Sequence, residues 1–238
     1  MNPKVTIIIP FYNCRYVDQA ISSALNQTYS HIEIIVVDDG STDFTEKIDP
    51  FKDKIRYLRK ENGGTATALN MGIEEAAGEY IAWLSSDDYF LTDKLSKQMS
   101  FMLSHQAEVS FTNYDCVDKK NRVLSAINGK RFLNANEVRK DFLNGNPING
   151  CTVLIKKDVF TEIGSFNPFF RYTHDYEMWF RLIVKGYNIH YLDEVLTKFR
   201  QHEASGTRHY QAEMQKEITI IEGSYRHLLM NLIKQSKR

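Results

Sequence analysis

The chain has 238 residues, and its thirty basic and thirty acidic side chains give a formal net charge of zero. This balance gives no support to a nucleic-acid partner, because such a partner usually calls for an excess of Lys and Arg. Hydrophobic residues make up 42% of the chain and charged residues 25%, which is typical of a globular protein. The length fits one large domain, or a domain with an extension.

Cysteine usage and apolar runs indicate where the protein works. Cys14, Cys116 and Cys151 are widely spaced and odd in number, which fits neither a disulfide framework nor a metal site. No apolar run approaches the ~20 residues of a membrane-spanning helix. The N-terminus also lacks the pattern of a signal peptide. We therefore expect a protein of the cytoplasm.

In the first half of the chain, short apolar segments alternate with segments of helical period. The predicted strands are 5–9, 32–37, 55–58 and 80–84, and the predicted helices are 16–26 and 65–77. A further short helix would be capped by Ser41 or Asp43. This alternation predicts right-handed crossovers and a parallel sheet.

The fourth predicted strand ends in small polar residues and two adjacent carboxylates, Asp87 and Asp88. Neighbouring carboxylates repel each other, and a divalent cation with oxygen ligands would compensate them. The simpler interpretation of an isolated Asp-Asp pair is a solvated turn before the next helix. Ligands bind at the carboxyl edge of such a sheet. The topology therefore predicts one crevice formed by polar loop residues, namely Tyr12, Asn13, Asp39, Asn62, Gly63, Asp87 and Asp88.

The second half alternates less regularly, as expected if it binds something variable. Its predicted helices are 91–103, 136–143, 158–163, 174–185 and 213–234, and its predicted strands are 109–112, 151–155 and 188–192. Residues 113–135 are mixed and turn-rich, and residues 199–210 are polar without periodicity. The last helix, 213–234, is amphipathic. Packing on the domain is its simplest role, and a homodimer contact or docking to a membrane face are the alternatives.

Six short motifs in this order resemble the family 2 glycosyltransferases, which have the GT-A fold. Each motif alone is weak, and it is their shared order that is specific. The resemblance covers most of residues 4–206. The chain differs from the family at Ser85, where many relatives have an aspartate. The motifs are Pro10–Asn13, Asp38–Asp43, Asn62–Gly64 with Ala68–Gly72, Gly78–Ile81 with Asp87–Asp88, His174–Asp175 with Trp179 and Arg181, and Arg200–Ser205.

The resemblance implies an α/β architecture, in which a Rossmann-like, mostly parallel central sheet is flanked by helices. The GT-A domain would cover residues 1–206. Its nucleotide-binding half would be about 1–112 and its acceptor-binding half about 113–206. Residues 207–238 would form a C-terminal helical extension.

The resemblance also implies roles for individual residues at the nucleotide end of the site. Tyr12 would stack on the base, and Asp39 would accept the base N–H. Asp88 would be the first ligand of Mn²⁺ or Mg²⁺, and Asp87 would support it or bind ribose. The nucleotide-binding set is Pro10, Tyr12, Asn13, Asp39, Asn62, Gly63 and Asp87.

At the acceptor end, Asp175 would be the general base. His202 would complete the metal or diphosphate site, and the role of His174 is left open. Structural alternatives exist for these residues and for the nucleotide set. Tyr12 could be a packed aromatic, Asp39 a helix cap, Asp175 a helix N-terminal carboxylate and His202 a surface histidine. Packing and orienting roles suit Trp179 and Arg181 best.

The implied activity is inverting, metal-dependent transfer of a hexosyl or N-acetylhexosaminyl group from a nucleoside-diphosphate sugar. The donor would be a UDP-sugar, and the acceptor a glycan or lipid-linked glycan of the cell surface, met at the inner face of the membrane. A sugar-nucleotidyltransferase is an alternative, but it should show a glycine-rich loop after the first strand. Residues 10–14 contain no glycine. A non-catalytic nucleotide-sugar-binding protein is the other alternative, and an intact Asp175 argues against it.

Overall fold

A computed structural model describes residues 2–203 and 210–235 of the chain. Its first half is a parallel α/β unit, as predicted. Strand β1 pairs in parallel with β2 and with β4, and β2 pairs in parallel with β3. The elements are β1 (Val5–Phe11), α1 (Val17–Leu25), β2 (Ile32–Asp38), η1 (Thr45–Phe51), β3 (Arg56–Arg59), α2 (Thr65–Glu75) and β4 (Tyr80–Trp83).

The second half adds antiparallel pairs to the same sheet. Strand β8 is antiparallel to both β4 and β6, while β6 and β9 are parallel. The strand order is β3-β2-β1-β4-β8-β6-β9-β5, and β7 pairs with β6. The elements are β5 (Tyr89–Phe90), α3 (Lys94–Ser104), β6 (Val109–Val117), β7 (Val123–Asn128), α4 (Ala135–Asp141), η2 (Gly150–Thr152), β8 (Leu154–Lys156), α5 (Lys157–Ile163), α6 (His174–Val184), β9 (Ile189–Arg200) and α8 (Gln211–Gln235).

Three local predictions were wrong. Neither Ser41 nor Asp43 caps the short helix, because it begins at Thr45 with Phe44 in the N-cap position. The strand predicted at 151–155 is divided between η2 and β8. Strand β9 continues well beyond residue 192, because it stays paired with β6 as far as the Val117–Arg200 pair, through a register shift after Thr112.

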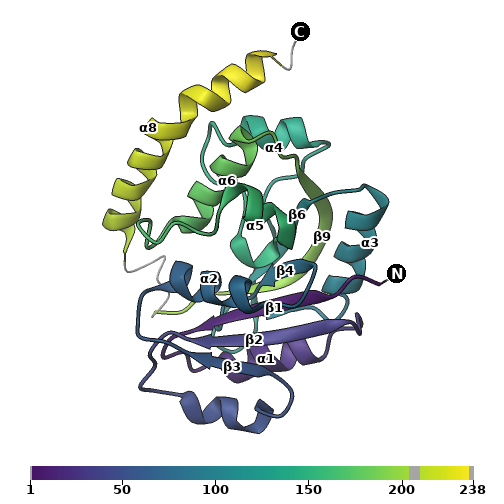
Figure 1. Cartoon of the computed structure of the whole chain (residues 1–238), viewed down its shortest axis with the longest axis vertical. Coiled ribbons are helices and arrows are strands. Elements are labelled where there is room, and N and C mark those ends of the chain that lie inside the picture. The colour runs from purple at the N-terminus through teal and green to yellow at the C-terminus, as the bar shows by residue number, and fades with distance from the viewer. Residues whose placement is uncertain (1, 204–209, 236–238) are drawn as a thin grey trace.

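The helices cover the two faces of the sheet (Figure 1). Alternate residues of β1 supply two cores, because successive side chains of a strand point to opposite faces. Val5, Ile7 and Ile9 pack with α1 and α3, whereas Ile8 packs with α2, α5 and α6. Helix α2 lies close to the sheet at Gly72, where an added Cβ would lie 2.4 Å from Ile8. The carboxyl ends of β1, β2 and β4 are thereby held firmly at one edge.

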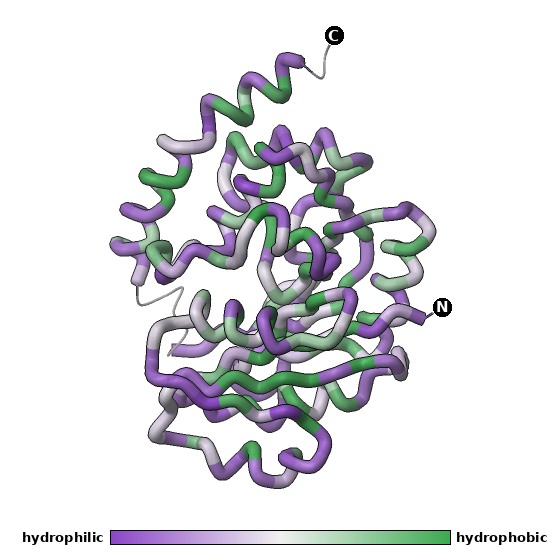
Figure 2. The backbone as a smooth tube through the Cα atoms, in the orientation of Figure 1, coloured by the Kyte–Doolittle hydropathy of each residue, from purple (hydrophilic) through white to green (hydrophobic). Residues whose placement is uncertain are grey.

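Helix α8 runs along the outside of α6 (Figure 1). Hydrophilic and hydrophobic residues alternate along it (Figure 2), and Ile221 and Leu229 are fully buried in the core that α6 shares. Packing, the simplest of the roles considered for this segment, is therefore confirmed. Within residues 2–203 and 210–235, no helix combines the length and apolar character needed to cross a membrane.

Candidate active site

Asp39 follows β2, and its carboxylate binds the loop that leads into α2. Oδ1 accepts hydrogen bonds from the Lys60 ammonium at 2.7 Å and from the Gly63 N–H at 2.9 Å, and Oδ2 accepts from the Gly64 N–H at 2.7 Å. The Asn62 amide donates to the Asp39 carbonyl at 2.9 Å. Asp39, Asn62 and Gly63 therefore lie together, as predicted. An ionised carboxylate accepts about four hydrogen bonds, and three of these positions on Asp39 are taken by Lys60, Gly63 and Gly64.

Asn13 shapes the neighbouring loop, and Tyr12 remains exposed beside it. Asn13 has a left-handed backbone (φ 47°), which asparagine tolerates better than most residues. Its side-chain oxygen accepts the N–H groups of Thr42 and Asp43 at 2.8 and 2.9 Å. Tyr12 is 54% exposed, so it is not a packed core aromatic, and its ring is available for stacking. Pro10 lies buried within β1 and contributes no exposed surface.

Asp38 has a structural role, because its carboxylate is used within the fold. Oδ1 accepts the Ser41 N–H at 2.7 Å, and Oδ2 accepts the Tyr57 hydroxyl at 2.5 Å. Asp38 is fully buried. These bonds hold the turn after β2 and so place Asp39 next to the α2 loop.

Asp88 is 1% exposed, and its two carboxylate oxygens differ in their hydrogen bonds. Oδ1 accepts the backbone N–H of Arg200 at 2.8 Å. Oδ2 is buried and has no hydrogen bond of standard geometry among the residues that the structure describes. The Cys151 thiol lies close enough to the Asp88 carboxyl to lower its pKa, but it donates at 3.0 Å to Ser85 instead. Burial and the nearby negative charge of Asp87 raise the pKa of the Asp88 carboxyl well above its usual range. Such an oxygen is costly to bury, and a cation would compensate it.

The segment that follows β9 completes this group. The His202 Nε2 lies 3.0 Å from the Asp87 carboxylate, and the His202 ring lies 5.3 Å from the Tyr16 ring. His202 is half-buried, so it is not a solvated surface histidine. Asp87, Asp88 and His202 are thus brought together as predicted. Ala204 and Ser205, the last residues of the motif that begins at Arg200, lie outside the described residues.

Arg200 connects the segment after β9 with Asp87 and Asp88. Arg200 is the first residue of a motif, but the sequence did not predict this role. It is fully buried and donates from Nε to the Asp87 carbonyl at 2.7 Å. Its guanidinium lies 4.3 Å from the Tyr16 ring centre. It also donates to Gln19 at 2.9 Å and to Asn121 at 2.5 Å. Those two residues help to line a groove of about 310 Å³ that contains no predicted site residue.

The donor set around Asp88 fits a metal that arrives with a phosphate ligand. Among residues 2–203 and 210–235, no three His, Cys, Asp or Glu side chains are grouped closely enough to hold an ion by themselves. Mg²⁺ at nucleotide sites usually takes one or two carboxylates together with substrate phosphates. The unpartnered Oδ2 of Asp88 fits that pattern. Ser85 adds no charge and instead accepts a hydrogen bond from the Cys151 thiol at 3.0 Å.

Asp175 lies in the first turn of α6 and is half-buried. The Asn146 side-chain amide donates to its Oδ2 at 3.3 Å. Burial raises the pKa of Asp175 from 3.8 to about 6, although the Tyr176 N–H and Asn146 oppose this. N–H groups at a helix terminus favour the ionised form of a carboxylate, but burial has the larger effect on the pKa of Asp175. A carboxylate with this pKa is still largely deprotonated at pH 7 and suits a general base.

His174 is buried among aromatic rings. Its ring lies 5.5 Å from Trp83 and 5.6 Å from Phe166, and neither ring nitrogen has a hydrogen-bond partner within the described part of the chain. Burial lowers the pKa of His174 to about 4, so the ring is neutral at pH 7. Trp179 packs against Phe166, and Arg181 binds Glu177 and two backbone carbonyls. Both are packing and orienting residues, as predicted.

Comparisons with known proteins agree with this geometry. The model of glycosyl transferase family 2 matches residues 6–164. An uncharacterized glycosyltransferase of Rickettsia typhi is 40% identical over 87% of this chain and 66% of its own length. TuaG of Bacillus subtilis, whose name places it in teichuronic acid biosynthesis, is 36% identical over 83% of this chain and 79% of its own length. WfaP of Escherichia coli is 33% identical over 92% of this chain and 85% of its own length.

Solved structures show the same fold. TarS of S. aureus, residues 1–349 in complex with UDP-GlcNAc, superposes with a TM-score of 0.72 at 20% identity, covering 92% of this chain and 65% of that one. The expected α/β GT-A fold is therefore confirmed. The chain spans between about one third and two thirds of the length of the Rickettsia relatives it matches. The match of the family model to most of the chain, together with relatives at 33–40% identity, shows that the chain belongs to glycosyl transferase family 2.

Proposed function

We propose that this chain transfers a sugar from a nucleoside-diphosphate sugar to an acceptor hydroxyl. The observation that carries the proposal is the buried, unpartnered Oδ2 of Asp88 at the carboxyl edge of the sheet. A buried polar atom without a partner costs free energy, and a cation bound together with a diphosphate would remove that cost. Family membership supports the same reaction class.

A UDP-sugar is the donor we propose. TarS has been solved with UDP and with UDP-GlcNAc, and the name of WfaP gives UDP-Glc as its donor. In this chain the exposed ring of Tyr12 would stack on the base, and the remaining acceptor position of Asp39 would take the base N–H. Asn62 and Gly63 would bind the nucleotide from the loop before α2. Asn13 would do so from the loop after β1, where Pro10, buried in the strand, supports the backbone. Asp87 would bind ribose or support the metal.

Mn²⁺ or Mg²⁺ would be held by Asp88, with Asp87 and His202 beside it. When bound, the ion would neutralise the charge that grows on the leaving diphosphate. The chain itself contributes the orientation of these groups. Arg200 fixes the Asp87 carbonyl and the Asp88 carboxylate from one side. His202 Nε2 contacts the side-chain carboxylate of Asp87 at 3.0 Å and so fixes that group.

Asp175 is the proposed general base of an inverting transfer. The acceptor oxygen would form a bond to the anomeric carbon as the bond from that carbon to the diphosphate oxygen breaks, and the hydroxyl proton would pass to Asp175. The acceptor we propose is a glycan, or a lipid-linked glycan, in surface-polysaccharide biosynthesis. The name of WfaP specifies a diphosphoundecaprenol-linked acceptor, and that of TuaG teichuronic acid. A lipid-linked acceptor would bring the enzyme to the face of a membrane.

A thermal-shift screen tests the donor class. UDP-, GDP- and dTDP-sugars are compared with and without Mn²⁺, in the parent and in Asp88→Ala. A ligand at 100 times its Kd stabilises a protein by about 2.7 kcal/mol, so a UDP-sugar should raise the melting temperature in a Mn²⁺-dependent way in the parent alone. Equal responses to all three nucleotides would contradict the proposal. Formation of a UDP-sugar and pyrophosphate from UTP and a sugar 1-phosphate would favour a sugar-nucleotidyltransferase, and binding without turnover would favour a sensor.

A further inference from the structure

The carboxylate of Glu217, on α8, binds the backbone that leads into the helix carrying Asp175. Its Oε1 accepts the Arg171 N–H at 2.9 Å. Its Oε2 accepts the N–H groups of Tyr172 and Thr173 at 3.0 and 2.9 Å, and the Thr173 hydroxyl at 2.6 Å. One side chain therefore fixes three consecutive backbone groups. Successive N–H groups that converge in this way form a binding site for an anion.

Helix α6 depends on this contact because its own cap is incomplete. Thr173 occupies the N-cap position but makes no side-chain hydrogen bond to the helix, whereas a threonine in that position usually does. Its hydroxyl donates to Glu217 instead. The path of the chain into α6, and so the place of Asp175 two residues later, is set by a residue of another helix.

Helix α8 also forms hydrogen bonds with the two residues of α6 that follow Asp175. The Tyr176 hydroxyl donates to Glu222 at 3.1 Å, and the Tyr225 hydroxyl donates to Glu177 at 2.8 Å. Asp175 thus lies between two segments that α8 holds, residues 171–173 and residues 176–177. Arg171 extends the same turn to the nucleotide loop, because its guanidinium donates to Asn62 at 3.2 Å.

We propose that Glu217 is a positioning residue that holds Asp175 against the acceptor while linking it to the nucleotide loop. This inference rests on the proposed role of Asp175 as the general base. It concerns a part of the chain that the family model, ending at residue 164, does not cover. The negative charge of Glu217 also acts on Asp175 directly, since it raises the pKa of that carboxyl.

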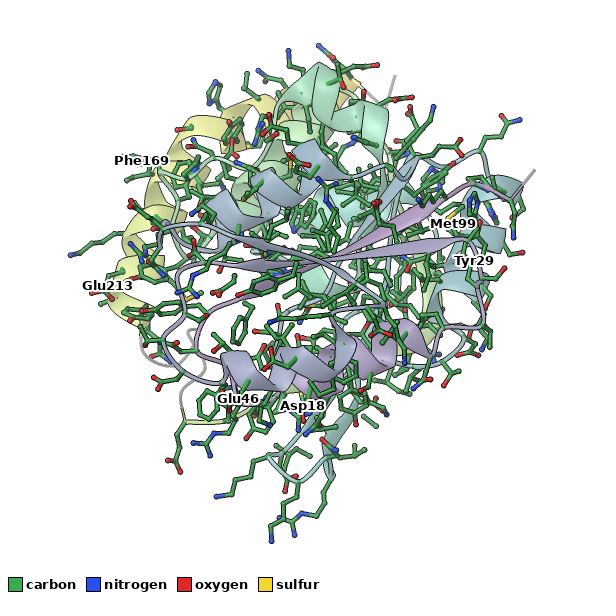
Figure 3. All side chains as sticks on the ribbon, turned by 60° about the horizontal axis from the view of Figure 1, so that its bottom comes forward. Asp18, Tyr29, Glu46, Met99, Phe169 and Glu213 are labelled. Atoms are coloured by element: carbon green, nitrogen blue, oxygen red, sulfur yellow. The ribbon has the colours of Figure 1, made fainter. Side chains whose placement is uncertain are left out.

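The test compares Glu217→Gln with Glu213→Gln, an exposed carboxylate in the first turn of the same helix (Figure 3). Glutamine keeps the shape of Glu217 but has one acceptor oxygen and no charge. Displacement of a catalytic group by about 1 Å can cost 10²-fold, so we expect kcat to fall by about 10- to 100-fold in Glu217→Gln, with UDP affinity little changed. The acid limb of the pH–rate profile should also move slightly to lower pH, because burial, the main cause of the raised Asp175 pKa, remains while the smaller contribution of the Glu217 charge is gone. Glu213→Gln should match the parent.

A purely structural contact would lower the melting temperature and leave the pH profile in place, and that result would overturn the proposal. If Glu217→Gln does not fold, Thr173→Val decides, because it removes only the 2.6 Å bond. We then expect a several-fold loss of kcat with unchanged UDP affinity, and unchanged kcat would overturn the proposal. Asp175→Asn separates the two hypotheses. Normal turnover in that variant refutes the base assignment, whereas an inactive Asp175→Asn beside a fully active Glu217→Gln refutes only the role of Glu217.

Discussion

Asp175→Asn should make the protein less active and more stable at the same time. Burial raises the pKa of Asp175 from 3.8 to about 6, so the folded state disfavours its ionised form. The free energy of unfolding should therefore fall as pH rises from about 4 to about 6, and stay lowest above that range. The full rise in pKa corresponds to about 3 kcal/mol. Because the carboxylate is only half-buried, solvent screening reduces the expected cost to about 1–2 kcal/mol.

Asparagine keeps the shape of the side chain and carries no charge. At pH 7 we expect Asp175→Asn to be about 1–2 kcal/mol more stable than the parent, and at pH 4 the difference should disappear. Turnover should fall by about 10²–10⁴-fold, which is the usual contribution of a general base, and donor affinity should persist. In the parent, turnover should decline below about pH 6, as Asp175 becomes protonated.

Three measurements on the same two proteins check this reasoning. They are denaturant unfolding at pH 4 and pH 7, UDP titration, and turnover with a working acceptor between pH 5 and pH 8. A variant that is destabilised at pH 7 would make Asp175 a structural residue of the α6 terminus. Parental turnover would refute the base assignment outright, and loss of UDP binding would move Asp175 to the donor site.

Three further outcomes follow from the same contacts. Asp88→Ala should abolish the Mn²⁺-dependent stabilisation by UDP while circular dichroism remains that of the parent, and parental binding of UDP with Mn²⁺ would remove Asp88 from the metal site. Asp39→Asn should weaken UDP binding by roughly 1–3 kcal/mol in calorimetry, and also lower the melting temperature, because the Lys60 ion pair is lost; unchanged affinity would leave Asp39 a purely structural role. Truncation after Gly206 should give insoluble protein in a pelleting assay, since it uncovers the core around Ile221, and soluble protein with normal activity would contradict this.

The sequence was sufficient for the parts of the site that local patterns determine. Strands β1, β2 and β4 are short, largely apolar and followed by polar loops, and the weaker β3 falls between two helical segments, so their alternation and shared edge could be inferred from the sequence pattern. The cluster of Asp39, Asn62 and Gly63 follows directly from that edge. In such a parallel unit the loops that follow the strands all lie at the carboxyl edge of the sheet, so their positions can be inferred without knowledge of distant contacts.

Long-range contacts determine the rest, and local patterns do not report them. Strand β9 extends to Arg200 because it pairs with β6 through a register shift, and the short run from Val195 to Phe199 does not by itself indicate this partner. Glu217 reaches a turn more than forty residues earlier in the chain. The pKa of Asp175 is a result of the same kind, because burial depends on how α6 packs, whereas the helix-terminus argument uses only neighbouring residues.

The two Asp-Asp pairs of the chain differ in how fully the protein compensates them, and this difference supports the proposal of a cation at Asp88. Asp38 and Asp39 receive hydrogen bonds on every carboxylate oxygen, from Ser41, Tyr57, Lys60, Gly63 and Gly64. Asp88 receives one, from the Arg200 backbone, and its other oxygen is buried without a partner among the described residues. A fold that needed the second pair only as a turn would leave it in water, where no such cost arises. A carboxylate that is buried and half-satisfied is the arrangement we expect if the proposed cation completes it.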